Sequence, residues 1–224
     1  MKNVLSKLKD HTKEINAIML RAQSSFRIMD YLYRTSEGLE IEIIRNHQFL
    51  KYTAELNWRI YVIELSKLLK PNPNKDDYYN LTTFISKFKQ GQEYEMIPGI
   101  DNETITKWED SLKDLKEQIQ NLLEQRDKLY SHTDKKHFLY KNKLSFADAN
   151  ELILVIQRVI NEIYIKVFGH SASFDPLGEP VDNLKQIVGI LVEQKKSQIK
   201  ALVDHGRSFG IDPKEFDVPP EYLK

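Results

Sequence analysis

Apolar residues recur every three or four positions along most of this 224-residue chain, which is the spacing of one face of an α-helix. Gly and Pro are scarce, with eight of each, whereas an average protein devotes about 12% of its residues to the two together. A β-sandwich needs a turn roughly every 8 to 12 residues, so this composition disfavours it. The sequence therefore predicts an all-α fold. The clearest apolar stripe lies between residues 3 and 35 and comprises Ile15, Ile18, Ala22, Phe26, Met29 and Tyr33.

The periodic segments predict about five long helices, which we expect to pack as an antiparallel bundle. The first helix covers residues 3–35. The second runs over 39–70, where Pro71 ends it. Residues 71–100 have a mixed pattern and include a short helix at 78–89. This stretch is too short to form a domain of its own, so we expect it to be an excursion from the bundle.

Capping residues mark the third and fourth helices. Asp101 is placed to act as the N-cap of the third helix. Ser145 and Asp148 have the spacing of a capping box at the start of the fourth helix. The fourth helix is almost wholly apolar over 152–168, which predicts a central, nearly buried position, and Gly169 is a plausible residue to end it.

The C-terminal part of the chain contains the fifth predicted helix. Pro180 suits the first turn of a helix, and we expect that helix to end at Gly206. The remaining residues include three prolines and predict an extended tail. The expected organisation is one helical domain over 1–205 and a C-terminal tail over 206–224.

Composition excludes several classes of function. The chain has no Cys, which rules out disulfide scaffolds, Cys-ligated zinc and thiol catalysis. Its 33 basic and 33 acidic residues balance, which argues against a protein that coats nucleic acid along its whole surface. The N-terminus lacks the apolar core of a secretory signal, and no apolar run approaches the roughly 20 residues of a membrane span. We expect a cytoplasmic protein with no membrane contact.

The third predicted helix carries a charged residue on its apolar stripe. The stripe is regular from Ile105 to Leu129, and position 126 is in phase with it, yet the residue there is Arg126. An arginine on a core-facing stripe must be paired, reach the helix end or line a cleft. His132 lies six positions later. On an α-helix the two residues lie about 60° to either side of Leu129, so they do not share a face. Both could still reach one phosphate if the long arginine side chain extends toward it, or if the helix ends near Tyr130.

The charge of the chain changes sign at this arginine. Residues 101–125 hold three Lys against seven Asp and Glu, whereas residues 126–143 hold six Lys and Arg against two Asp. Tyr130, Phe138 and Tyr140 lie among these basic residues. Basic side chains with interleaved aromatic rings are typical of single-stranded RNA binding. The residues that we expect to contact RNA are Lys128, Tyr130, Lys135 and Lys136.

The spacing of Arg126 and His132 resembles the signature of the HEPN superfamily. In that signature an Arg is followed, after four to six residues, by a His at the end of a long helix in an all-helical domain. The segments RDKLYSHTDK and ELSKLLKPNPNKDDYYNL are similar more narrowly to its abortive-infection U (AbiU-like) branch. Residue by residue, Arg126 and His132 match the catalytic positions, and Asp127 matches the polar position after the Arg.

The resemblance implies an HEPN-like helical bundle and a metal-independent endoribonuclease without a cofactor. It also implies a homodimer that builds its active site from the motifs of both subunits. Its implied role is that of a phage-defence or toxin effector, with RNA as substrate and an antitoxin or defence-system protein as a possible partner. The residue types suit this chemistry, because histidine transfers protons near neutral pH and arginine offers a permanently charged fork to phosphate.

Two other interpretations stay open at this point. Arg126 can simply stabilise the end of its helix while His132 is an exposed loop residue, which leaves a non-catalytic helical module that binds RNA, a nucleotide or a protein partner. His132, Asp134 and His137 have the spacing of a small metal cluster. The segment around them is positively charged and supplies no further ligand, so we expect no metal site there.

Overall fold

The computed structural model describes residues 2–35, 38–71, 78–131, 141–175 and 179–211. Within these ranges all regular structure is helical, which confirms the predicted all-α class. The elements, two of them π-helices, are α1 (Lys2–Arg34), α2 (Gly38–Asn46), α3 (Gln48–Leu69), α4 (Leu81–Ser86), α5 (Asn102–Asp114), α6 (Lys116–Gln125), η1 (Arg126–Ser131), α7 (Phe146–Ile163), η3 (Tyr164–Phe168) and α8 (Pro180–Ser208).

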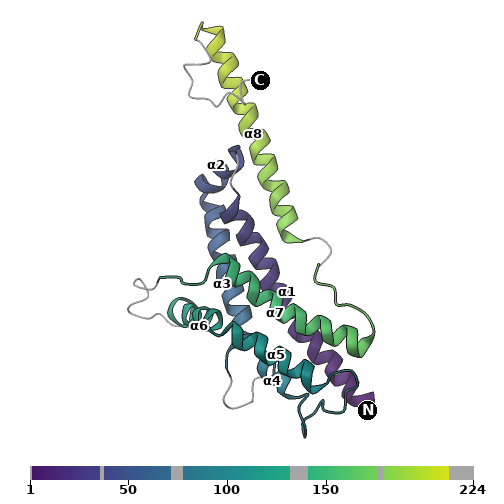
Figure 1. Ribbon diagram of the computed structural model, residues 1–224. Coiled ribbons are helices and arrows are strands. Elements are labelled where there is room, and N and C mark those ends of the chain that lie inside the picture. The colour runs from purple at the N-terminus through teal and green to yellow at the C-terminus, as the bar shows by residue number, and fades with distance from the viewer. Residues whose placement is uncertain (1, 36–37, 72–77, 132–140, 176–178, 212–224) are drawn as a thin grey trace.

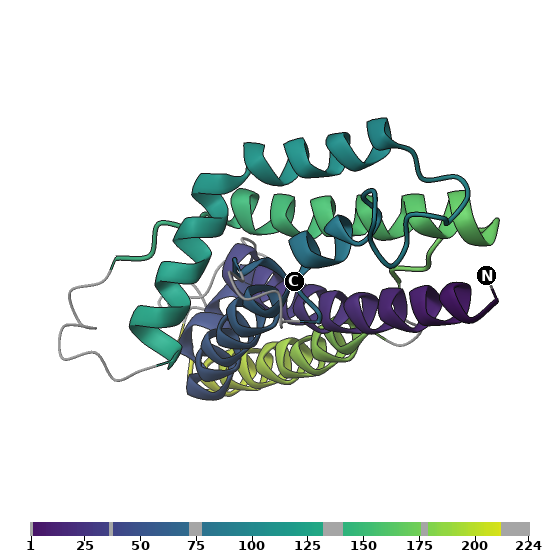
Figure 2. The ribbon, with the colours of Figure 1, turned by 90° about the horizontal axis from the view of Figure 1, so that it is seen from below.

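Helices α1 and α3 form the central antiparallel pair of the bundle, and α7 crosses α1 (Figure 1). Viewed from below, α5 lies over α7 on the side away from this pair, and α6 turns from the end of α5 toward α3 (Figure 2). The apolar stripes predicted from the sequence meet between these helices. The largest fully buried side chains of this main core are Leu8, Ile15, Met19, Met29, Tyr61, Leu65, Leu68, Leu81, Phe84, Ile85, Tyr94 and Leu122.

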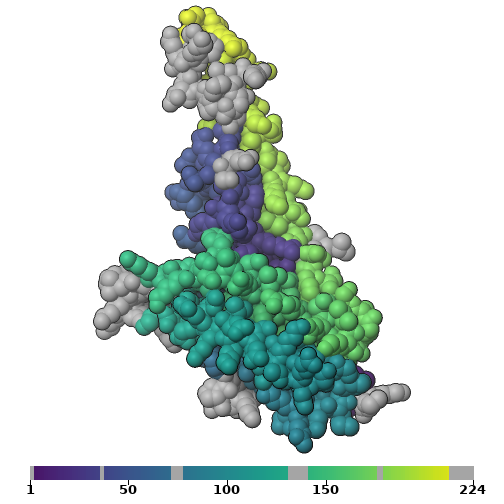
Figure 3. Space-filling view, viewed as in Figure 1, coloured from purple at the N-terminus to yellow at the C-terminus, as the bar shows by residue number. Residues whose placement is uncertain are grey.

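Helix α8 joins the body through a second, smaller apolar cluster. Val188 of α8 packs there with Ile44 of α2, Leu32 of α1, and Leu50 and Ala54 of α3. The C-terminal part of α8 continues past α2 and projects from the body (Figures 1 and 3). Large apolar side chains on α8 remain exposed, Ile190 by 68%. The body is therefore a bundle, and α8 extends from it as a single helix.

Local capping chemistry sets the helix boundaries where the sequence predicted it. Asp101 Oδ1 accepts a hydrogen bond from the Thr104 backbone N–H at 2.8 Å. The Ser145–Asp148 capping box is complete in both directions. Gly169 takes a left-handed φ of 75° directly after η3, a conformation that costs glycine little. Pro180 occupies the first turn of α8.

Three details of the predicted helices were wrong. The segment 39–70 is not one helix, because His47 is extended and separates α2 from α3. The third predicted helix divides at Leu115 into α5 and α6. The last helix continues past Gly206 to Ser208. Neither break is marked by Gly or Pro, and the first lets α2 turn toward α8 and bury Ile44.

One residue of the first apolar stripe also departs from its predicted place. Tyr33 is in phase with the buried face of α1, but its side chain is 55% exposed. It lies near the end of α1, where its ring contacts Phe146 edge-on with centroids 5.9 Å apart. For Tyr33, therefore, a position on the apolar stripe of α1 does not lead to a buried side chain.

The described helices include none that is long and apolar enough to cross a membrane. Residues 212–224 of the predicted tail lie outside the described ranges. The division into a domain over 1–205 and a tail over 206–224 stays a prediction.

Candidate functional site

Arg126 lies at the junction of two kinds of helix. Helix α6 ends at Gln125, and the backbone continues from Arg126 to Ser131 as the π-helix η1. A π-helix forms hydrogen bonds from residue i to i+5, one residue further than an α-helix. The rotation around the helix axis from one side chain to the next therefore differs from that of an α-helix. Such turns are common at functional sites, although η3 shows that this fold also uses one elsewhere. Neither π-helix is recognisable from the pattern of residues.

The guanidinium of Arg126 is held by its neighbour. The side chain is 16% exposed, and its Nε and Nη2 both donate to Asp127 Oδ1, at 2.8 and 2.5 Å. Arginine has five N–H donors, and this contact uses two of them. Among the residues that the structure describes, the other three donors have no partner and can serve another acceptor, such as a phosphate. The sequence predicted that an arginine at this position must be paired, reach the helix end or line a cleft, and the structure pairs it with Asp127.

Tyr130 follows Arg126 on the same π-helix and is half-buried against the main core. Burial raises the pKa of its phenol to about 12. The positive charge of Arg59 and a hydrogen bond with Gln125 act in the opposite direction, and Tyr33 and Glu55 add to the increase. The Cζ atom of Arg59 lies 5.7 Å from the centre of the Tyr130 ring. Tyr130 is therefore an uncharged phenol at neutral pH, with a guanidinium over its ring.

The structure describes some of the predicted site residues and not others. Arg126, Asp127, Lys128 and Tyr130 all belong to η1, and Lys128 is exposed. His132, Lys135 and Lys136 lie outside the described residues, as do Asp134 and His137 of the considered metal cluster. The roles of these residues stay predictions. Among the residues that the structure does describe, no group of three or more His, Asp or Glu side chains is arranged to hold a metal ion.

A cavity of about 320 Å³ opens beside η1. Sequence reasoning missed it, because its walls come from three elements that are distant in the chain. The local signal is one aromatic residue, Tyr52, which stands outside the apolar phase of α3 and is 62% exposed. The lining residues are Tyr33 of α1, Tyr130 of η1, and Tyr52, Glu55, Leu56, Trp58 and Arg59 of α3.

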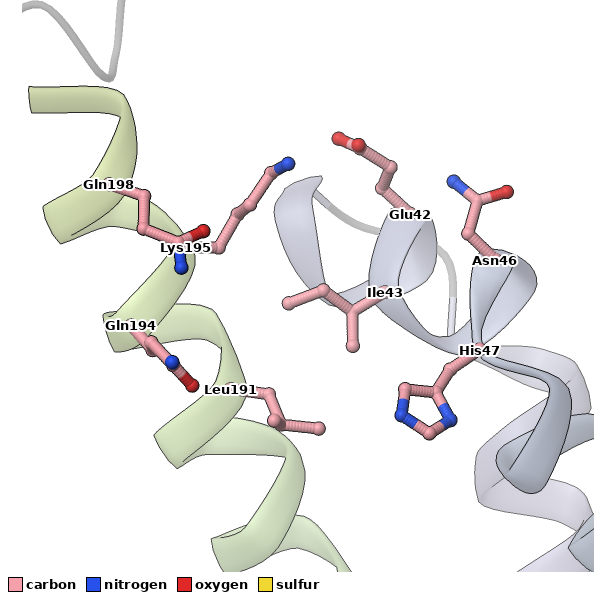
Figure 4. A pocket seen from close by; sticks show the side chains of 8 residues that line it. All are labelled: Glu42, Ile43, Asn46, His47, Leu191, Gln194, Lys195 and Gln198. Carbon is pink, nitrogen blue, oxygen red and sulfur yellow. The ribbon is translucent and has the colours of Figure 1, made fainter. Parts of the chain in front are cut away.

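A second hollow, of about 340 Å³, lies between α2 and α8 (Figure 4). Ile43 and Leu191 extend into it from its two walls, the His47 ring is turned toward Leu191, and Lys195 and Glu42 stand near the rim. The groove is lined by a mixture of amide, apolar and isolated charged groups. Within the described part of the chain no hydrogen bond or ion pair joins Glu42 to His47 or Lys195, so the groove offers less to catalysis than the region around η1.

Comparison with known proteins gives one match. The family model HEPN_AbiU2, described as AbiU2, matches residues 5–187 of the chain. This range covers α1 to α7 with both π-helices and the first turns of α8, so it includes the whole described bundle and the Arg126 motif. Searches of curated proteins and of solved structures found no match.

Proposed function

The chain belongs to the HEPN_AbiU2 family, and from this premise we propose that it is a metal-independent endoribonuclease that acts as a phage-defence or toxin effector. The observation that carries the proposal is the geometry of Arg126. Its guanidinium is held by Asp127, and within the described ranges three of its donors make no other hydrogen bond, which leaves them for a phosphate. In the sequence His132 comes directly after Ser131, the last residue of η1, so the second motif residue is close to Arg126 along the chain.

In the proposed reaction the 2′-hydroxyl of RNA attacks the adjacent phosphorus. A bond forms between O2′ and phosphorus, and the bond between phosphorus and O5′ breaks. A base removes the proton of the 2′-hydroxyl, and an acid donates a proton to the departing O5′. The products are a 2′,3′-cyclic phosphate and a 5′-hydroxyl. Arg126 stabilises the charge on the phosphorane, and His132 carries protons.

The need for both an acid and a base supports a homodimer. Each chain contributes one His132, and one imidazole cannot be protonated and unprotonated at the same moment. A two-fold arrangement would bring two copies of the motif to one phosphate, with one histidine in each role. Lys128, Tyr130, Lys135 and Lys136 would hold the RNA next to them, and an antitoxin or defence-system protein would control the activity.

The decisive experiment is cleavage of RNA by the purified protein, with and without EDTA. Wild-type activity should persist in EDTA and leave cyclic phosphate ends. His132→Ala should lower the rate by about 10²- to 10⁴-fold, which is the usual contribution of a positioned acid–base group. Arg126→Ala should be nearly as harmful, and Arg126→Lys should rescue little, since an ammonium does not reproduce the arginine fork.

Two matched controls distinguish these losses from general damage. His47 is an exposed histidine whose side chain makes no capping hydrogen bond, and Arg45 is an exposed arginine of α2. His47→Ala and Arg45→Ala should leave cleavage unchanged. Activity abolished by EDTA would replace the mechanism, and full activity in His132→Ala would remove that residue from it.

The groove of Figure 4 favours one alternative, a module that binds a protein partner without catalysis. In that case no RNA would be cleaved, and expression in cells would have no effect that depends on His132. Toxicity that disappears in His132→Ala and persists in His47→Ala would exclude this alternative.

A further inference from the structure

The cavity beside η1 has the composition of a binding site for a flat ring. Tyr33, Tyr52 and Tyr130 reach it from α1, α3 and η1, and Trp58 lines it as well. Its volume of about 320 Å³ lies at the lower end of the range of small-ligand sites. Four aromatic side chains from three elements therefore surround a space suited to a nucleobase rather than to a protein segment.

Some of these rings present open surface to the cavity. Tyr52 is 62% exposed, and it contacts no other aromatic ring in the described part of the chain. By contrast, Trp58 is stacked on Tyr61, with centroids 5.2 Å apart, which gives it a structural role. Exposed tyrosine faces are where a base can stack, and stacking accepts any base because each has a π-face. Tyr52 is thus the clearest stacking platform of the cavity.

The charged groups of the cavity are Glu55 and Arg59, one turn apart on α3. Arg59 lies over the Tyr130 ring. Glu55 lies near two tyrosines. The pKa of Tyr33 is raised first by burial and second by the negative charge of Glu55. The same charge contributes to the raised pKa of Tyr130. No ion pair joins Glu55 to another described residue. Its carboxylate therefore keeps its capacity to accept hydrogen bonds from a ligand.

The position of the cavity relates it to the proposed catalytic site. Tyr130 lies four residues after Arg126 on η1, an advance of at most about 6 Å at 1.5 Å per residue. An RNA strand whose phosphate contacts the Arg126 guanidinium would carry a neighbouring base to the cavity. This step depends on the proposed function, because it places RNA at Arg126.

We propose that the cavity of Tyr52, Glu55, Arg59 and Tyr130 is a base-specific subsite that binds a guanine of the RNA next to the cleaved phosphate. A carboxylate only accepts hydrogen bonds. On its Watson–Crick edge guanine presents two adjacent donors, the N1–H and the N2 amino group, which match the two oxygens of Glu55. The corresponding edges of adenine and cytosine pair one amino donor with an unprotonated ring nitrogen, and uracil sets its one N–H between two carbonyls. Tyr52 supplies the stacking, and Glu55 selects the base.

The test is binding of RNA that cannot be cleaved. The probes are four labelled 2′-O-methyl pentanucleotides, UUGUU and its counterparts with A, C or U at the centre, because 2′-O-methylation removes the attacking hydroxyl. Fluorescence anisotropy gives the dissociation constant, and Trp58 reports on the cavity, since the other tryptophan, Trp108, is only 2% exposed. The central-guanine probe should bind about tenfold more tightly than the others and change the Trp58 emission.

Two variants separate stacking from base selection. Tyr52→Ala should weaken all four probes by about tenfold. Glu55→Gln should remove the preference for guanine and leave binding of the all-uridine probe unchanged. The matched controls are Tyr79→Ala, an exposed tyrosine just before α4 that does not line the cavity, and Glu151→Gln, an exposed carboxylate of α7. Both controls should bind like the wild type.

Failure of this proposal is distinguishable from failure of the proposed function. Equal affinity for the four probes, absence of binding, or a preference for guanine that survives Glu55→Gln would overturn the subsite, whether or not the protein cleaves RNA. A preference for guanine that depends on Glu55 would support the subsite even if cleavage were absent, and only the catalytic proposal would then fall.

Discussion

His11 is completely buried in α1, and the structure predicts that acid destabilises the protein through it. Its Nε2 lies 2.5 Å from the backbone oxygen of Tyr78, which can only accept, so Nε2 carries the proton and donates. Its Nδ1 is then the acceptor for the Tyr94 hydroxyl at 3.1 Å. The ring also stacks on Tyr78, with centroids 3.9 Å apart. The site is built for the neutral imidazole.

Burial lowers the pKa of His11 from its ordinary value of 6.5 to about 4. The hydrogen bond with the Tyr78 carbonyl and the charge of Glu93 favour the protonated form, and the charge of Lys87 opposes it, but burial outweighs them. Because the pKa is lower in the folded protein, the unfolded chain binds a proton first as the pH falls. The stabilisation is therefore complete above pH 6.5 and is lost as the pH falls toward 4.

The expected size follows from about 1.4 kcal/mol per pKa unit. Between pH 7 and pH 4.5 the wild type should lose about 2 kcal/mol of unfolding free energy through His11 alone. The assay is urea unfolding of the wild type and His11→Gln at both pH values. Other groups titrate in both proteins, so the difference between the two losses isolates His11.

Two results would refute this reasoning. Equal losses of unfolding free energy in the wild type and in His11→Gln would show that the imidazole makes no contribution to the acid sensitivity. An NMR titration that placed the pKa of His11 at or above 6.5 in the folded protein would show that burial does not govern its protonation.

The remaining predictions concern a glycine, a buried hydroxyl and assembly. Gly99→Ala should lower the unfolding free energy by at least about 2 kcal/mol, because φ is +93° and a Cβ atom would lie 2.7 Å from the Lys166 carbonyl oxygen. Gly91→Ala, with φ of +76° and open space around the Cβ position, should cost only the backbone strain of about 1 kcal/mol. Tyr61→Phe should cost about 1 kcal/mol, because the buried hydroxyl donates to the Ala149 carbonyl at 2.8 Å; denaturant unfolding measures all three variants. Light scattering at micromolar concentration should give twice the mass of one chain, and a monomer would contradict the composite active site.

Helix ends were predictable wherever a side chain or a glycine sets them locally. Asp101 and the Ser145–Asp148 pair satisfy backbone N–H groups within their own first turn, and Gly169 supplies a left-handed residue. These interactions involve residues within three or four positions of each other. They are therefore visible in the sequence without knowledge of the tertiary structure.

The helix breaks at His47 and Leu115 were not predictable from the sequence, and at His47 packing between distant elements accompanies the break. At His47 the chain leaves the direction of α3 and places Ile44 in the cluster with Val188 of α8. No residue near either break has an unusual conformational preference that would identify it. The same is true of Tyr33, whose stripe predicts burial, although the cavity between α1, α3 and η1 leaves it exposed.

The candidate site shows where helical-wheel reasoning reaches its limit. The in-phase position of Arg126 predicted a paired or cleft-lining arginine, and its pair is Asp127, the next residue in the chain. The angular relation between position 126 and the residues after it assumed α-helical geometry, and η1 replaces that geometry from Arg126 onward. A π-turn directs Tyr130 to a cavity whose other walls lie about 70 to 100 residues earlier in the sequence. Residue types thus indicated the chemistry that we propose for the segment, whereas the tertiary structure was needed to find the cavity next to it, which we propose as the subsite for an RNA base.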